Sequence, residues 1–149
     1  MSTVATSIEV NVPVRTAYNQ WTQFEQFPQF MEGIKEVQQL DDRRLHWKAE
    51  IGGRAKEWDA EITEQIPDQR IAWKSVGGAM NQGMVTFESL SDTKSLVQLN
   101  IGYEPEGMVE TVGDETGAVS LRVKKDLERF KEFIEVRGRE TGAWRGTVK

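Results

Sequence analysis

A long β-hairpin is predicted by the stretch RAKEWDAEITEQIPDQRIAWKS, which runs from Arg54 to Ser75. Apolar and polar residues alternate in both arms, as they do in half-buried strands. A turn is expected between the arms because Pro67 fixes one φ angle and Asp68 favours turns. The face expected to be buried carries Trp58, Ala60, Ile62 and Ile66 in the first arm, and Ile71 and Trp73 in the second. Each arm therefore places an indole where it can fill a core or line a pocket.

The pattern of an antiparallel sheet extends along most of the chain. Alternation predicts further strands at residues 6–12, 34–40, 45–51, 83–88 and 97–103. The irregular pattern of residues 34–40 indicates a bulge or an edge position. Two short helices are expected between the first two strands. One opens at Pro13, and the other covers FEQFPQFM, residues 24–31, and closes one end of the core.

The period of the apolar residues becomes helical from Met108 to Val136. The stripe consists of Val112, Thr116, Val119, Val123, Leu127, Phe130 and Ile134. Because so long an amphipathic helix must bury one side, we expect it to lie across the apolar face of the sheet. The tail, residues 138–149, allows two interpretations. Trp144 docks it on the body, or it forms a basic interaction tail with Arg137, Arg139 and Arg145.

Composition narrows the classes of function. A chain of 149 residues fits one domain, residues 1–149, and its net charge of −5 argues against binding nucleic acid or anionic membranes. No apolar run is long enough to span a bilayer, and the first residues do not resemble a secretion signal, so a cytoplasmic location is expected. With no cysteine and only His46, placed on a polar strand face, we expect no metal site and no cofactor.

Several strings, together with this order of elements, resemble one family across essentially the whole chain. They are VNVP at residues 10–13, FPQFM at 27–31, the hairpin at 54–75, GMVTF at 83–87, DLERFKEFIE at 126–135 and ETGAWRG at 140–146. They resemble the bacterial polyketide cyclase/dehydrase-like branch of the helix-grip superfamily (SRPBCC), which includes START lipid-transfer domains and birch-pollen-type proteins. The resemblance implies an α+β helix-grip fold, in which a curved seven-stranded antiparallel sheet wraps around the long C-terminal helix.

The resemblance also implies a pocket between the sheet and the last helix. Carried over by strand parity, its sheet lining is Trp47, Trp58, Ala60, Ile62, Trp73, Val85, Phe87, Leu99, Ile101 and Tyr103. Its helix lining is Val119, Val123, Leu127 and Phe130. For each residue, ordinary core packing is an equally good explanation. The leading hypothesis is a protein that binds a hydrophobic or aromatic small molecule, such as a lipid, an isoprenoid or a polyketide.

Two alternatives remain open. Cyclase or dehydratase chemistry would need an acid or base in the pocket. The polar residues of inward parity are Glu64, Ser75, Tyr103, Thr116 and Ser120, with Tyr103 and Glu64 the weak catalytic candidates. No two of them form a recognisable catalytic pair, so the sequence favours binding over catalysis. The third hypothesis is an interaction protein that uses the basic tail or a sheet edge. A homodimer is compatible with all three.

Overall fold

Seven antiparallel strands form one sheet in the computed structural model, which describes residues 2–31, 33–51, 53–76, 81–103 and 118–148. The strands are β1 Ser2–Val10, β2 Ile34–Gln39, β3 Arg44–Ile51, β4 Arg54–Ile66, β5 Arg70–Val76, β6 Asn81–Ser91 and β7 Lys94–Tyr103. Their order across the sheet is β1-β7-β6-β5-β4-β3-β2. The described helices are α1 Val14–Trp21, the 3-10 helix η1 Phe24–Gln29 and α3 Ala118–Arg137.

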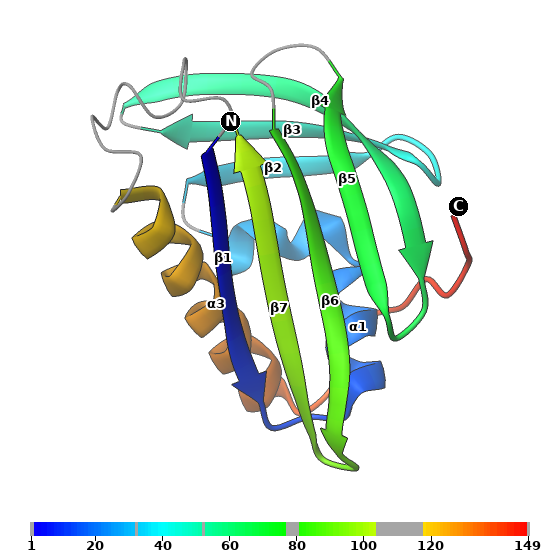
Figure 1. Ribbon diagram of the computed structural model, residues 1–149. Coiled ribbons are helices and arrows are strands. Elements are labelled where there is room, and N and C mark those ends of the chain that lie inside the picture. The colour runs from blue at the N-terminus through cyan, green and yellow to red at the C-terminus, as the bar shows by residue number, and fades with distance from the viewer. Residues whose placement is uncertain (1, 32, 52, 77–80, 104–117, 149) are drawn as a thin grey trace.

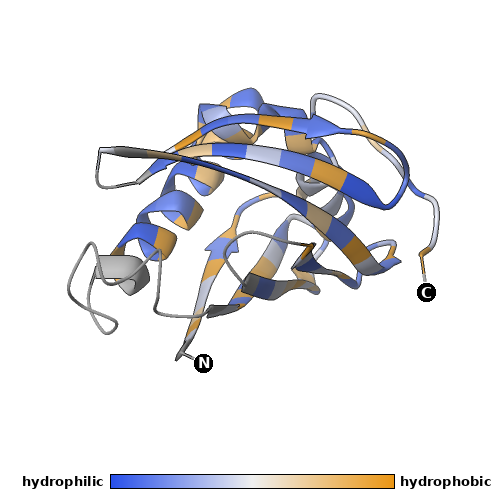
Figure 2. Cartoon of the chain, turned by 90° about the horizontal axis from the view of Figure 1, so that it is seen from above, coloured by the Kyte–Doolittle hydropathy of each residue, from blue (hydrophilic) through white to orange (hydrophobic). Residues whose placement is uncertain are grey.

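The sheet curls, and the helices lie on its concave side. β1, β7, β6 and β5 stand side by side, while β2, β3 and β4 turn across one end (Figure 1). α3 runs against β1, and η1 packs against β2. Hydrophobic and hydrophilic residues alternate along the strands (Figure 2), so one face of the sheet can meet the helices while the other meets water. The predicted α+β helix-grip fold is therefore confirmed.

Aromatic side chains fill the space between the helices and the sheet. Trp21 of α1 lies at the centre, with its ring 4.9 Å from Phe130 of α3, 5.5 Å from Phe27 of η1 and 6.3 Å from Phe87 of β6. Phe24 and Phe30 join the same buried cluster. The prediction that FEQFPQFM closes one end of the core is confirmed.

A bulge in β4 contradicts part of the predicted hairpin. The register between β4 and β5 shifts between Ile62 and Glu64, which inserts one extra residue and reverses the side-chain alternation. Gln65 is consequently buried at 1% exposure on the concave side. The expectations that Ile66 shares the buried face and that Glu64 has inward parity are wrong, because the bulge turns both toward the outer face.

Other boundaries differ by a few residues. β1 begins at Ser2 and ends at Val10, whereas residues 6–12 were predicted. β2 is an edge strand with a register shift between Ile34 and Glu36, as its irregular pattern predicted. Of the helix predicted from Met108 to Val136, α3 covers residues 118–137, and the part before residue 118 lies outside the described residues.

The C-terminal segment lies across α1 and the end of β4. The Thr141 amide donates to Gln20 Oε1 at 2.8 Å, and Arg145 donates to Asn19 Oδ1 at 2.6 Å and to Asp68 Oδ2 at 2.8 Å. The amides and carbonyls of Gln65 and Val148 pair in both directions, at 2.8 and 2.9 Å. The segment formed by residues 139–148 is called the tail below.

Candidate functional site

Three indoles lie on the concave face, toward the end of the sheet where β3, β4 and β5 meet. Trp47 of β3 and Trp58 of β4 are directly opposite each other, and their rings are stacked, with centroids 6.0 Å apart and planes 3° apart. Trp73 of β5 is opposite Ile62 of β4. Cross-strand aromatic pairs stabilise a sheet, and flat rings also offer a surface for other flat or apolar groups. We call Trp47, Trp58 and Trp73 the indole face.

Burial falls toward the indole face. Phe130, Ile134 and Val85 are 0% exposed, so the space between helices and sheet is filled around them. Trp58, Trp73 and Ile101 are only partly buried, although strand parity turns them inward. The concave side is therefore packed with aromatic residues near Trp21 and is less covered by described residues near the indole face.

Gly83 of β6 allows Trp73 to lie against the sheet. The two residues are cross-strand partners, and a Cβ built on Gly83 would overlap the indole ring, lying 2.8 Å from its Cε2 atom. A side chain at this position would push the indole out of its place. Sequence reasoning missed this role, although a glycine at an inward strand position was the available signal.

Replacing Gly83 by alanine should therefore lower the free energy of unfolding by about 1–3 kcal/mol through overpacking. Urea unfolding measures the loss. In a Trp73→Ala background the same substitution should cost much less, because the overlapping ring is absent. Equal costs in the two backgrounds would show that the indole does not depend on Gly83.

The indole face offers one unused hydrogen-bond donor. Trp47 Nε1 is buried and has no hydrogen-bond partner within the described part of the chain. Buried indole N–H groups usually have a partner, so this atom is suited to an acceptor on a bound molecule or to water. Ser75 is also buried on this side of the sheet, but it already has an interaction partner.

The two catalytic candidates, Glu64 and Tyr103, lie in different parts of the sheet. Glu64 lies on the outer side and accepts two hydrogen bonds from Arg70, at 2.6 and 3.1 Å. Arg70 thereby lowers the pKa of Glu64, which makes this residue a poor proton donor. Tyr103 ends β7 and pairs with Asn81 of β6, but its side chain, like those of Val119 and Ser120, lies outside the description, as does Thr116.

The other residues predicted to line the pocket belong to the hydrophobic core. Ala60, Ile62, Val85, Leu99, Val123, Leu127 and Phe130 are buried in one cluster that also contains Phe87 and Trp47. Side chains so enclosed pack against each other, so Trp58, Trp73 and Ile101 are the described lining residues with surface left for a guest. No group of three or more metal-binding side chains occurs among the described residues.

Comparison with known proteins places the chain in a family. Residues 10–134 match the family described as polyketide cyclase/dehydrase and lipid transport. The chain belongs to this family. A relative in Streptomyces lincolnensis, described as an uncharacterised 17.2 kDa protein, is 56% identical over 149 residues and covers 99% of both chains. Many solved structures are also similar to this chain.

Two of them show the range of similarity. A protein of Deinococcus radiodurans is 27% identical with a TM-score of 0.71, over 91% of this chain and 99% of that one. The ZhuI aromatase/cyclase of Streptomyces sp. R1128 has a TM-score of 0.77 at 12% identity, over 95% of this chain and 98% of that one. At that identity the similarity shows the fold alone.

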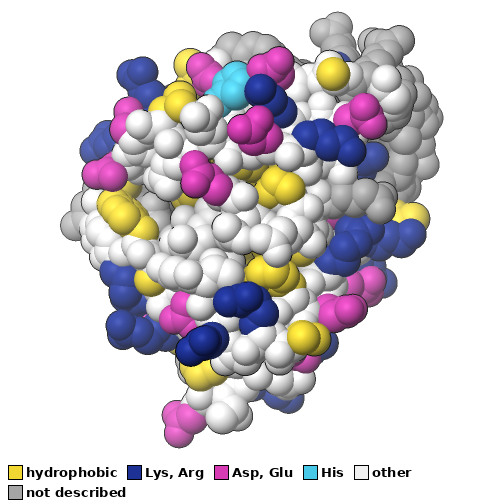
Figure 3. Space-filling model, turned by 180° about the vertical axis from the view of Figure 1, so that it is seen from behind, with side chains coloured by type: hydrophobic (Ala, Val, Ile, Leu, Met, Phe, Trp, Pro, Cys, Tyr) yellow, Lys and Arg dark blue, Asp and Glu magenta, His cyan; other side chains and the backbone are white. Residues whose placement is uncertain are grey.

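In this family member the single histidine lies on the outer face of the sheet (Figure 3), behind the stacked indoles. His46 Nδ1 is 2.6 Å from Asp59 Oδ1, and Nε2 is 2.9 Å from Glu57 Oε1. Hydrogen bonds to Asp59 and then to Glu57 raise the pKa of His46. His46 thus links β3 to β4 from outside and takes no part in the concave site.

The raised pKa of His46 predicts a pH dependence. A raised pKa means that the folded state favours protonation, so the stabilisation is complete below the ordinary pKa of about 6.5 and is lost as pH rises through the folded value. The exposed pair should contribute less than about 1 kcal/mol. Urea unfolding of wild type and His46→Gln should differ most in mild acid and converge in alkali. A difference that grows with pH would contradict this sign.

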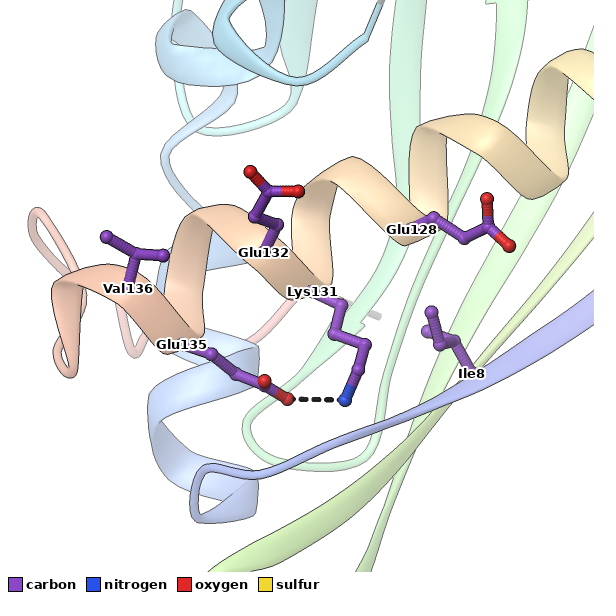
Figure 4. A pocket seen from close by; sticks show the side chains of 6 residues that line it. All are labelled: Ile8, Glu128, Lys131, Glu132, Glu135 and Val136. Carbon is purple, nitrogen blue, oxygen red and sulfur yellow. Dashed lines mark hydrogen bonds and ion pairs between the residues drawn. The ribbon is translucent and has the colours of Figure 1, made fainter.

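The protein has a second concave site, a groove of about 630 Å³ between β1 and α3 (Figure 4). It is lined by Ile8, Glu128, Lys131, Glu132, Glu135 and Val136. Lys131 Nζ is 2.6 Å from Glu135 and also donates to the Glu9 carbonyl, while Glu135 accepts from the Asn11 amide at 2.7 Å. These bonds fasten α3 to the edge strand, which gives Lys131 and Glu135 a structural role.

No helix among the described residues is both long and apolar enough to cross a membrane.

Proposed function

We propose that the protein binds a hydrophobic or aromatic small molecule, such as a lipid, an isoprenoid or a polyketide, against the indole face. The observation that carries the proposal is the stacked pair Trp47 and Trp58, beside a partly exposed Trp73, on the side of the sheet that faces the helices. Apolar walls with few polar groups are typical of small-molecule sites. The family description supports the same class of ligand.

The geometry suggests how such a guest would be held. The parallel indole planes of Trp47 and Trp58 suit a flat or extended apolar group, while Trp47 Nε1 can donate to an oxygen of the guest. The donor would then fix the orientation of a ligand whose affinity comes mainly from burial. We place this binding activity in the cytoplasm, in line with the composition of the chain.

The experiment combines extraction and titration. Protein purified under native conditions is extracted with solvent, the extract is analysed by mass spectrometry, and candidate lipids and polyketides are titrated while tryptophan fluorescence is followed. Trp58→Leu should weaken binding about tenfold or more, because a stacked ring is lost. Trp144→Phe, in the tail, is the matched control and should retain affinity. No extracted molecule and no saturable response would overturn the proposal.

The family description also favours a second candidate, cyclisation or dehydration of a polyketide-like substrate. The same titration tests it, because conversion would appear as a product of changed mass. Tyr103 is the candidate acid for such a step, and Glu64 is not, since it lies on the outer face. An interaction role for the tail is less favoured, because Arg145 is bonded to Asn19 and Asp68.

A further inference from the structure

One flank of α3 carries charged side chains at helical spacing, on the side of the helix that faces η1 and the start of β2. On this flank Phe133 contacts Phe30, with ring centroids 5.4 Å apart, and Arg129 donates to Asp126 at 2.9 Å. Arg122 lies on the same flank, one turn before Asp126. It forms no ion pair or hydrogen bond with any other residue that the structure describes. Its guanidinium is therefore available to an anion.

Gly33, just before β2, leaves room for this guanidinium. A Cβ built on Gly33 would lie 2.8 Å from Nη1 of Arg122 and 3.4 Å from the carbonyl oxygen of Glu50. Gly33 has a φ of +94°, a region that favours glycine, and its carbonyl accepts from the Glu50 amide at 2.7 Å. The guanidinium consequently lies beside the backbone at the point where β2 begins and β3 nears its end.

This point is at the rim of the concave side. Val123, next to Arg122 on α3, is buried at 6% exposure, whereas Leu121 on its other side is 53% exposed. On the sheet, Ala49 is buried and comes directly before Glu50. α3 begins near these ends of β2 and β3 (Figure 1). The partly buried Arg122 thus lies where the core meets the solvent.

The indole face lies further along the same strands. Trp47 comes three residues before Glu50 on β3, which corresponds to about 10 Å along the strand. Lys56 of β4 has the same inward parity as Trp58, so it adds a second positive charge on this side of the sheet. Lys56 already has an interaction partner, which leaves Arg122 as the better binding group for an anion.

We propose that the ligand is an amphipathic anion, whose apolar chain lies on the indole face and whose carboxylate or phosphate group pairs with Arg122. This inference rests on the proposed binding function and adds the chemical class of the head group. A guanidinium presents paired N–H donors that match two oxygens of a carboxylate or a phosphate. The unused Nε1 of Trp47 is also a donor, so a ligand with acceptor oxygens fits this side better than an amine.

Three probes that share one apolar chain test the head group. Dodecanoate, dodecyl phosphate and dodecanol are titrated below their aggregation concentrations while tryptophan fluorescence is followed. Wild type should bind at least one of the two anions about tenfold or more tighter than dodecanol, because the anion gains charge-assisted hydrogen bonds. The anion that binds tighter identifies the head group. Arg122→Gln should lose this preference while its affinity for dodecanol stays unchanged.

Lys124→Gln is the matched control, because it removes the same charge from an exposed position on α3, and it should keep the preference. Arg122→Lys should keep part of it, since the charge remains but the paired donors are lost. Equal affinity for the three probes, or a preference that Arg122→Gln leaves intact, would overturn the anionic head group and leave the proposed binding function standing. No saturable response to any probe would also overturn it, and the solvent extract then tests the binding function separately.

Discussion

Replacing Trp21 by alanine is expected to lower the free energy of unfolding by about 3–5 kcal/mol, the range for large buried aromatic residues. Trp21 is 2% exposed, and its ring contacts aromatic rings from η1, α3 and β6. Its removal leaves a cavity at the point where both helices and the sheet meet. Chemical unfolding followed by circular dichroism measures the loss, since a signal from the backbone does not depend on the deleted indole.

Trp21→Phe is the matched variant for this prediction. It keeps an aromatic ring at the centre of the cluster and should recover most of the lost free energy. A loss near 1 kcal/mol for Trp21→Ala would show that the aromatic cluster collapses around the gap, so that Trp21 is not its centre.

Deleting the tail by truncation after Gly138 is expected to lower the free energy of unfolding by about 3–5 kcal/mol. The truncation removes Val148, which is 3% exposed, the partly buried Trp144, and the hydrogen bonds of Thr141 and Arg145. It also uncovers Tyr18, whose ring lies 5.5 Å from the Arg145 guanidinium. Thermal and urea unfolding of the two chains measure the effect.

A point variant keeps this prediction testable if the truncated chain does not fold. Arg145→Met retains much of the side chain but loses the bonds to Asn19 and Asp68, and should cost about 1–3 kcal/mol. Arg139→Met, an exposed change in the same tail, is the control and should stay within about 0.5 kcal/mol of wild type. A truncated chain as stable as the full one would mean that the tail only rests on the surface.

Both predictions concern stability and not the proposed ligand contacts. Both Trp21 and the tail lie away from the indole face, so neither substitution removes a group that we propose touches the ligand. Loss of stability with retained affinity, in variants that still fold, would separate the scaffold from the site. Trp58→Leu should show the reverse, a clear loss of ligand affinity with a smaller loss of stability.

Strand faces followed from the sequence because alternation is a local property. Trp47, Trp58 and Trp73 were placed on one side from the period of two alone, and the structure brings the first two into a stacked pair. The helical face of Val14, Ala17, Tyr18 and Trp21 could be found in the same way, since a period near 3.6 residues fixes which side chains share a helix face.

The bulge at Thr63 and the buried amides depended on partners far along the chain. A bulge arises from the register between two strands, which residues of one strand do not reveal, and it exchanged Glu64 for Gln65 on the concave side. Asn19 and Gln20 are buried because residues more than a hundred positions later cover them and bond to them. Asn and Gln are mostly exposed in proteins, so their residue type alone does not indicate this burial.

The amino-acid sequence by itself determined the sheet, the helix across it and the side on which the indoles lie. Each of these follows from the spacing of apolar residues that are close together in the chain. Only the folded molecule decided which indole N–H lacks a partner among the described residues and which carboxylate leaves the concave side. Those features are set by register, bulges and distant hydrogen-bond partners, which come together only when the whole chain packs.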